Sequence, residues 1–207
     1  MATAFKPYPC CRFSHGALDL ALALRREGLE ASEVASVQLR IYKTDILGYG
    51  HHPRSIVDAQ FCLPYLVATA LVRGRVGLTE LSDEAIRDPS ILAVSERITV
   101  EEDPGFTAQY PDRYPTELVV TLRNGRRVGR FNDCPSGDPE AAEYTVDPGL
   151  LHRQVEEHVR ALLGETGYGD RAEALIRTAR GLTELSEVRV LADLLGRQVN
   201  IGGQSRR

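Results

Sequence analysis

The segment TELVVTLRNGRRVGRFN, residues 116–132, constrains the fold of this chain more than any other stretch of its sequence. Apolar and polar residues alternate on both sides of the dipeptide Asn124-Gly125, a period of two that is typical of strands with one buried face. Asn-Gly tolerates the positive φ angles of a type I′ turn, so we predict that turn here. The chain therefore contains an antiparallel hairpin.

Other helical and strand patterns precede this hairpin. The stretch EVASVQLRIYK alternates apolar and polar side chains and predicts another strand. Ser14 and Ser55 stand where they can cap the apolar helices that follow them, and Asp58 completes a capping-box-like pair with Ser55. Pro64 lies inside the second helix and should kink or divide it, because proline removes a backbone donor.

These patterns predict an α+β fold, in which helices lie beside a small mixed or antiparallel sheet within residues 1–146. We expect a C-terminal helical segment over residues 147–196 and a flexible tail over residues 197–207. The first helix of that segment carries its apolar side chains on one side: Leu151, Val155, Val159 and Leu162. A small sheet offers these helices no obvious place, so we expect them to pack on a helical partner.

Composition excludes several classes of protein. The chain is 43% apolar and 26% charged with a net charge of −4, and it lacks the basic stripe of a nucleic-acid-binding surface. No apolar run approaches the ~20 residues of a membrane span. We therefore predict a cytoplasmic protein without nucleic-acid or membrane partners. Four cysteines without a C-x-x-C pair indicate free thiols and no metal site.

The segment FKPYPCCRFSHGALDL contains the first cluster of candidate functional residues. Lys6, one of only two lysines, can bind a carboxylate or transfer a proton, and a solvated surface lysine is the alternative. His15 can act as an acid or base, and a histidine that is hydrogen-bonded to nearby backbone is the alternative. Cys10 and Cys11 are near a helix start, but no base is specified for them. We therefore favour buried, unreactive thiols.

The loop GYGHHP contains the second cluster. The Tyr49 hydroxyl, between two glycines, can donate a hydrogen bond to a developing enolate oxygen. His51 and His52 are candidate substrate-binding residues, and adjacent histidines rarely converge on one metal ion. An ordinary surface loop is the alternative. Two loops at the ends of secondary-structure elements can meet across a cleft, where binding sites usually lie.

Several motifs in this order resemble the MmgE/PrpD family over residues 5–196. KPYPCCRFSHGALDLALALR resembles the start of the family's second domain, with its lysine, aromatic-proline pair and histidine before a helix. YGHHP and AQFCLPYLVATALVRG resemble the tyrosine loop and the helix behind it. LVVTLRNGRR and SGDPEA resemble the hairpin and the turn beyond it. The resemblance implies an α+β lid domain followed by helices that pack back on a large helical domain.

The resemblance also implies an activity. Members of this family catalyse cofactor-free lyase or isomerase reactions on carboxylic acids by proton transfer beside a carboxylate. By that resemblance Lys6 would bind the carboxylate or transfer a proton, and Tyr49 would orient or protonate the substrate. His15 is a weaker match, and Cys11 stands where some members have a histidine. The substrate is therefore expected to be a small molecule that bears a carboxylate.

Family members are longer, and their helical domain precedes the segment seen here. The chain is therefore either a fragment or one subunit of a split enzyme. Because it starts at Met1 close to that boundary, we favour a split enzyme, a hetero-oligomer whose partner is a helical-domain subunit. Two alternatives stay open. The chain can be a non-catalytic lid that binds a helical subunit, or the scaffold can guide a cyclisation or isomerisation in a specialised biosynthetic pathway.

Overall fold

The computed structural model covers the 207 residues of the chain, and the structure describes residues 4–141, 144, 146–147 and 149–196. The chain divides into two compact units, Met1–Asp147 and Pro148–Arg207, which we call unit 1 and unit 2. The predicted tail, residues 197–207, lies outside the described residues. Among the helices that the structure describes, none is long and apolar enough to cross a membrane.

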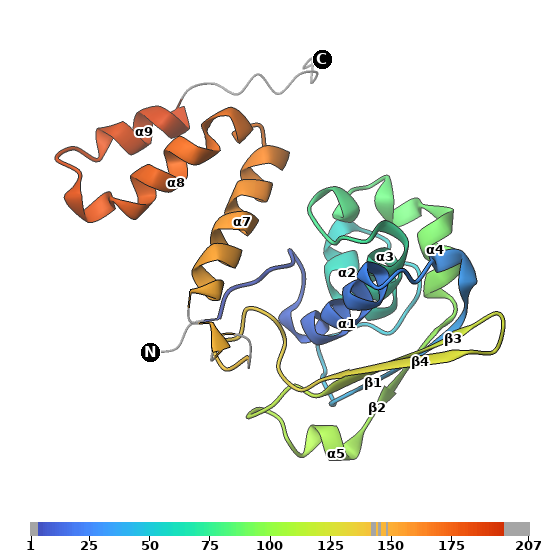
Figure 1. Ribbon diagram of the computed structural model, residues 1–207. Helices are drawn as coiled ribbons and strands as arrows, with labels where there is room; N and C mark the ends of the chain where they lie inside the picture. Colours follow the sequence, from blue (N-terminus) through green and yellow to red (C-terminus); the bar gives the residue numbers. More distant parts are fainter. Residues whose placement is uncertain (1–3, 142–143, 145, 148, 197–207) are drawn as a thin grey trace. The chain divides into compact units, whose positions relative to one another are not determined.

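Unit 1 contains a four-stranded mixed sheet in the order β2-β1-β3-β4 (Figure 1). β1 is parallel to β2 and antiparallel to β3, and β3 is antiparallel to β4. The strands are β1 Val34–Ile41, β2 Ile98–Glu102, β3 Thr116–Leu122 and β4 Arg127–Asn132. The predicted α+β class is confirmed.

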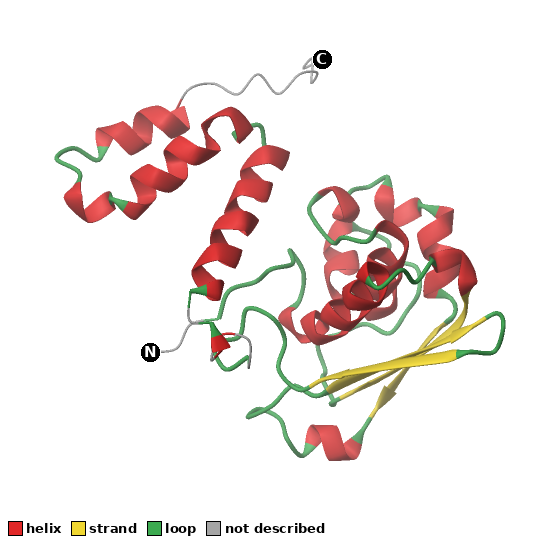
Figure 2. Ribbon diagram, viewed as in Figure 1, coloured by secondary structure: helices red, strands yellow, loops and turns green. Residues whose placement is uncertain are grey.

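Helices cover one face of this sheet (Figure 2). The α-helices of unit 1 that the structure describes from first to last residue are α1 His15–Arg26, α2 Ile56–Phe61, α3 Leu63–Arg73, α4 Pro89–Ser95 and α5 Pro104–Thr107. Short 3-10 helices are η1 Arg12–Ser14, η2 Ala31–Glu33, η3 Thr79–Leu81 and η4 Ala85–Arg87. α1 packs on β3 and β4, and α3 packs on β2, α1 and α4. Alternate strand residues such as Leu39, Leu118 and Val120 are fully buried beneath these helices.

The predicted hairpin is confirmed, but the predicted type I′ turn is wrong. Gly125 has a φ of +84°, whereas no described residue other than glycine has a positive φ. The Leu122 N–H donates to the Arg126 carbonyl at 2.8 Å, which closes a three-residue loop. In this register Val128 lies opposite Val120 on the face toward the helices. A two-residue loop would shift β4 by one residue and turn Val128 to the other face, so burial decides the register.

Two helix starts differ from the predicted caps. Ser55 accepts a hydrogen bond from the Asp58 N–H at 3.1 Å, as predicted. A capping box would also have the Asp58 carboxylate accept from the Ser55 N–H. The carboxylate accepts from the Arg54 N–H instead, at 2.8 Å, so this second hydrogen bond of the predicted pair is wrong. Ser14 precedes α1 without capping it, because its hydroxyl donates to the Cys11 carbonyl at 2.6 Å.

The predicted division at Pro64 is confirmed. The helix stops at Phe61 and starts again at Leu63, with Pro64 in the first turn of the new helix. Proline is tolerated there because the first N–H groups of a helix have no helical acceptor.

The described secondary structure of unit 2 is helical. It contains α7 Leu150–Glu165, η5 Gly169–Arg171, α8 Ala172–Arg180, η6 Leu182–Glu184 and α9 Arg189–Gly196. α8 packs against both α7 and α9. A groove of about 390 Å³ runs between α7 and α8, with Val155, Val159 and Ile176 among its lining residues. No residue of α7 is buried, so its apolar side remains accessible within this unit.

Candidate functional site

A pocket of about 500 Å³ lies in unit 1 where the N-terminal segment meets the break between α2 and α3. It combines two cationic side chains, two thiols and several apolar groups. The lining residues are Lys6, Pro9, Cys10, Cys11, Arg12, Phe13, Ile46, Gln60 and Phe61. We call it the Lys6 pocket.

The helix break holds the N-terminal wall of this pocket in place. Pro64 has no N–H, so the carbonyl of Gln60 lacks its usual helical donor four residues later. The Cys11 N–H donates to that carbonyl instead, at 2.9 Å. The Gln60 side chain donates to the Pro9 carbonyl at 3.0 Å. Gln60 therefore holds this wall through both its backbone carbonyl and its side chain.

The same break holds the loop that carries Ile46. The Gly48 N–H donates to the Phe61 carbonyl at 2.8 Å, and the Leu63 N–H donates to the Gly48 carbonyl at 2.9 Å. The Cys62 thiol donates to the Gly50 carbonyl at 2.9 Å. Both polar loops that the sequence singled out therefore attach to residues 60–63.

The Lys6 pocket has a cationic and an apolar character. Lys6 is exposed, and no acidic residue is among the lining residues. Arg12 is partly buried and forms an ion pair with Asp138, with 2.5 Å between Nη2 and Oδ2. Phe13, Ile46 and Phe61 supply apolar surface. Such a lining suits an anionic molecule with an apolar portion, because cations attract the charge and the rings exclude water.

Cys10, one of the two pocket thiols, is a poor nucleophile. All four cysteines are free, as their spacing predicted, and Cys10 and Cys11 are buried. Burial raises the pKa of Cys10 to about 12, although a contact with the Ser14 hydroxyl at 3.3 Å opposes this shift. A thiol with so high a pKa is protonated at neutral pH, and only the thiolate reacts readily.

His15 is fully buried and does not line the Lys6 pocket. Its ring lies edge-on to Tyr8 with 5.1 Å between the centroids. Burial, and then the Arg12 guanidinium, lowers the pKa of His15 to about 3, and the Cys10 backbone opposes this slightly. The imidazole is therefore neutral at physiological pH, which fits a packing role in the first turn of α1.

The tyrosine loop places its polar side chains on other partners. The Tyr49 hydroxyl donates to Glu102 Oε1 at 3.0 Å at the end of β2. Burial, followed by this carboxylate, raises the pKa of Tyr49. His52 pairs with Glu96 at 2.9 Å, and both side chains are largely exposed. The His51 carbonyl accepts from the Ser95 hydroxyl at 3.1 Å.

The structure thus brings Lys6 and Cys11 into one pocket and leaves Tyr49, His51 and His52 outside its lining. Sequence reasoning missed Arg12, Ile46 and the residues of the helix break. Arg12 stands inside the same polar segment as Lys6, so its charge was an available signal. Ile46 was also visible, as an apolar residue in a polar loop.

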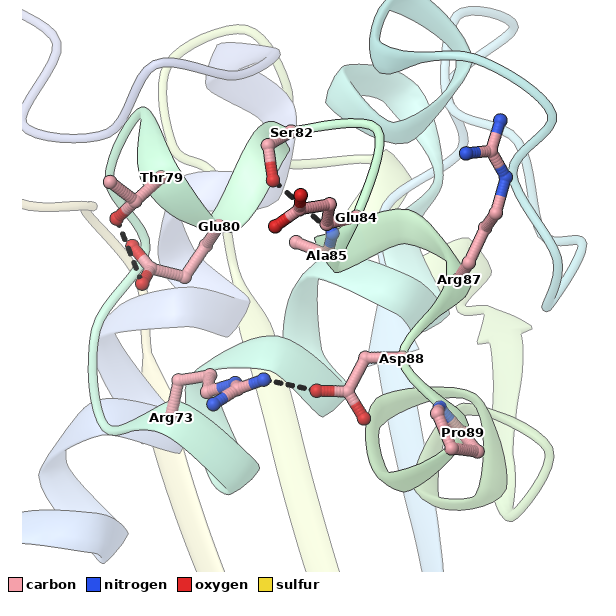
Figure 3. A pocket seen from close by; sticks show the side chains of 9 residues that line it. All are labelled: Arg73, Thr79, Glu80, Ser82, Glu84, Ala85, Arg87, Asp88 and Pro89. Atoms are coloured by element: carbon pink, nitrogen blue, oxygen red, sulfur yellow. Dashed lines mark hydrogen bonds and ion pairs between the residues drawn. The ribbon is translucent and has the colours of Figure 1, made fainter.

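A larger cavity of about 570 Å³ lies near the end of α3 (Figure 3). Two of its charged groups pair with each other, Asp88 and Arg73, and Asp88 also caps α4. The buried Glu80 carboxylate accepts from Arg75 Nε and from the Gly77 N–H, both at 2.9 Å. These hydrogen bonds stabilise the loop that follows α3. Across the part of the chain that the structure describes, no group of three or more His, Cys, Asp or Glu side chains could hold a metal ion.

Comparison with known proteins identifies the family. The model of the MmgE/PrpD C-terminal domain matches residues 8–147. A 2-methylcitrate dehydratase of Cupriavidus necator is 34% identical over 120 residues, which are 54% of this chain and 23% of that protein. The 2-methylcitrate dehydratase of Escherichia coli K12 is 30% identical over 150 residues, 67% of this chain and 29% of that protein.

A mitochondrial 2-methylcitrate dehydratase of Yarrowia lipolytica is 30% identical over 149 residues, 69% of this chain and 28% of that protein. The chain therefore spans between 23% and 29% of the length of these relatives. The matched residues include the Lys6 pocket wall from Pro9 onward, the sheet and the turn after β4. The resemblance seen in the motifs is confirmed, and the chain belongs to the MmgE/PrpD family, of which it contains the C-terminal domain.

Proposed function

We propose that this chain is the substrate-binding part of a cytoplasmic dehydratase-type lyase, which acts without a cofactor on a small carboxylate-bearing substrate. The Lys6 pocket is the observation that carries the proposal. It offers two cations against an apolar wall and no acidic lining residue. The relatives named 2-methylcitrate dehydratase support the reaction type.

Loss of water breaks one C–H bond and one C–O bond and forms a carbon–carbon double bond. The proton goes to a base, and the departing hydroxide leaves as water after it gains a proton. When the C–H bond lies next to a carboxylate, negative charge develops there in the transition state. Lys6 binds this carboxylate and stabilises the charge, because its ammonium attracts the negative charge that develops there.

Tyr49 is the second proposed catalytic residue. Its raised pKa keeps the hydroxyl protonated, so it is available as a hydrogen-bond donor. In this structure that donor is occupied by Glu102. Action on a substrate therefore requires the hydroxyl to leave Glu102. His51 and His52, in the same loop, are proposed to bind the substrate.

We further propose that a helical-domain subunit completes the enzyme as a hetero-oligomer. One observation supports this arrangement: the apolar side of α7 carries no buried residue. An accessible apolar stripe on a helix favours a helical partner, because burying it releases ordered water.

The test is a reconstitution of the chain with the helical protein that copurifies with it from native extract. Conversion of 2-methylcitrate is followed by NMR of the unsaturated product. Lys6→Ala should lower kcat/KM by on the order of 100-fold or more. Lys43→Ala, which removes the only other lysine, should have no effect. Activity retained in Lys6→Ala would contradict the role of Lys6.

Other outcomes decide between the alternatives. If no helical protein copurifies, the hetero-oligomeric arrangement is wrong. If the complex is active and neither Lys6→Ala nor Tyr49→Phe affects it, the chain is a non-catalytic lid. If the complex rearranges or cyclises a substrate without releasing water, the biosynthetic cyclase or isomerase is the correct function.

A further inference from the structure

A turn after β4 contacts the N-terminal segment on both sides of the Lys6 pocket wall. The Phe5 N–H, directly before Lys6, donates to the Gly137 carbonyl at 3.0 Å. The next residue of the turn, Asp138, forms the ion pair with Arg12. One turn therefore holds the backbone beside one pocket cation and the side chain of the other.

This turn is itself firmly held. The Ser136 N–H donates to Asp19 Oδ2 at 2.7 Å, and the Gly137 N–H donates to the Tyr144 hydroxyl at 2.9 Å. Gly137 has a φ of +82°, and a Cβ built on it would lie 2.4 Å from the Phe5 carbonyl oxygen. The close contact with Phe5 thus requires glycine, and it places Asp138 at a fixed distance from the pocket wall.

Arg12 has hydrogen-bonding capacity beyond its pair with Asp138. Its Nη1 is buried and has no hydrogen-bond partner among the described residues. The guanidinium carbon lies 6.0 Å from the centre of the Tyr114 ring, which supports the cation from one side. A guanidinium offers five N–H donors, and buried donors that lack an acceptor are unfavourable. Arg12 is among the residues that line the Lys6 pocket, and a carboxylate bound there would supply the missing acceptor if it reached Nη1.

We infer that Arg12 is a second anion-binding residue of the Lys6 pocket and that Asp138 is a positioning residue that holds it there. The inference rests on the proposed function for the premise that the pocket takes a carboxylate. It adds that two acidic groups of one molecule bind together, one at Lys6 and one at Arg12. Arginine suits this role because its planar fork matches a carboxylate.

The first experiment compares two four-carbon probes, succinate with two carboxylates and butyrate with one. Their affinities for the full chain are measured by calorimetric titration. Succinate should bind more tightly than butyrate, and Arg12→Met should weaken succinate by about tenfold or more while leaving butyrate unchanged. Arg126→Met, on the exposed hairpin loop, controls for net charge. The inference is overturned if the wild-type chain does not prefer succinate, or if Arg12→Met keeps the preference.

The second experiment tests Asp138 through a double-mutant cycle. Asp138→Ala releases the guanidinium, which lowers succinate affinity, but it also removes a negative charge, which acts in the other direction. The coupling therefore carries the test. The effect of Asp138→Ala on succinate affinity should differ by about threefold or more between the wild-type and the Arg12→Met backgrounds. Equal changes in both backgrounds would show that Asp138 does not act through Arg12.

Control variants and thermal unfolding distinguish a loss of binding from a loss of folding in this cycle. Glu140→Ala, in the same turn with an exposed side chain, should bind succinate like the wild type. Thermal unfolding checks each variant, and Asp138→Asn, which keeps an acceptor oxygen, replaces Asp138→Ala if the latter does not fold. Succinate binding needs no turnover. If succinate binds through Arg12 but the reconstituted complex releases no water, only the proposed function fails. Lys6-dependent activity without succinate preference overturns only the inference.

Discussion

The pH dependence of folding tests the environment assigned to His15. Its side chain is inaccessible to solvent, and its pKa falls from 6.5 to about 3, mainly through burial. In the unfolded chain the imidazole titrates near its ordinary pKa of about 6.5. Between these two values the unfolded state binds more protons than the folded state. The free energy of unfolding therefore decreases as the pH falls through this window, and the contribution is absent above it.

The two pKa values set the size of the effect. At pH 7 the folded imidazole is neutral and only about a quarter of the unfolded imidazole is protonated, so the group contributes little. At pH 5 the unfolded imidazole is nearly fully protonated while the folded one is still neutral. The difference in proton binding lowers the free energy of unfolding by about 2 kcal/mol between pH 7 and pH 5. That is a substantial share of the ~5–15 kcal/mol typical of a folded protein.

Urea unfolding at pH 7 and pH 5, followed by near-ultraviolet circular dichroism, measures this difference. The signal reports mainly on unit 1, because Tyr168 is the one tyrosine of eight that follows residue 147. Wild type should lose about 2 kcal/mol more than His15→Leu over this range, since the variant has no imidazole to titrate. Equal pH dependence in wild type and His15→Leu would refute the assigned burial.

Two further predictions concern packing in unit 1. Gly137→Ala should lower stability by about 2–5 kcal/mol, because it combines a strained positive φ with a clash against the Phe5 backbone, whereas Gly50→Ala should change it by less than about 0.5 kcal/mol. Thermal unfolding measures both. Tyr65→Phe should cost about 1–2 kcal/mol in urea unfolding, because the buried Tyr65 hydroxyl donates to the Glu80 carbonyl at 2.8 Å. An unchanged midpoint would mean that this carbonyl has another donor.

Local patterns were enough to predict the elements that local physics decides. The alternation in residues 116–132 predicted the hairpin, and Pro64 predicted the helix division. The turn type needed more than local preference. Asn124-Gly125 favours a two-residue turn, but burial of Val128 opposite Val120 requires the three-residue loop. A tertiary contact outweighed a dipeptide propensity.

The candidate site was predictable only in part, for a related reason. Lys6 and Cys11 share one continuous segment, so their meeting in one pocket follows from short-range geometry. The partner of Arg12 is 126 residues away, and nothing local to either residue specifies it. Likewise, Tyr49 looked available because glycines flank it. Its acceptor, Glu102, is placed by the parallel pairing of β1 and β2, which the sequence did not reveal.

The helix break at residues 60–63 connects a local sequence feature with the tertiary contacts of the candidate site. From the sequence, Pro64 was only a cause of irregularity in a buried helix. In the fold, the missing N–H of Pro64 leaves the Gln60 carbonyl for Cys11, and the end of α2 leaves the Phe61 carbonyl for Gly48. Each acceptor fixes one of the two loops that border the Lys6 pocket. An uninterrupted helix would use both carbonyls internally. The irregularity is therefore the feature that lets this domain build a pocket from two separate loops.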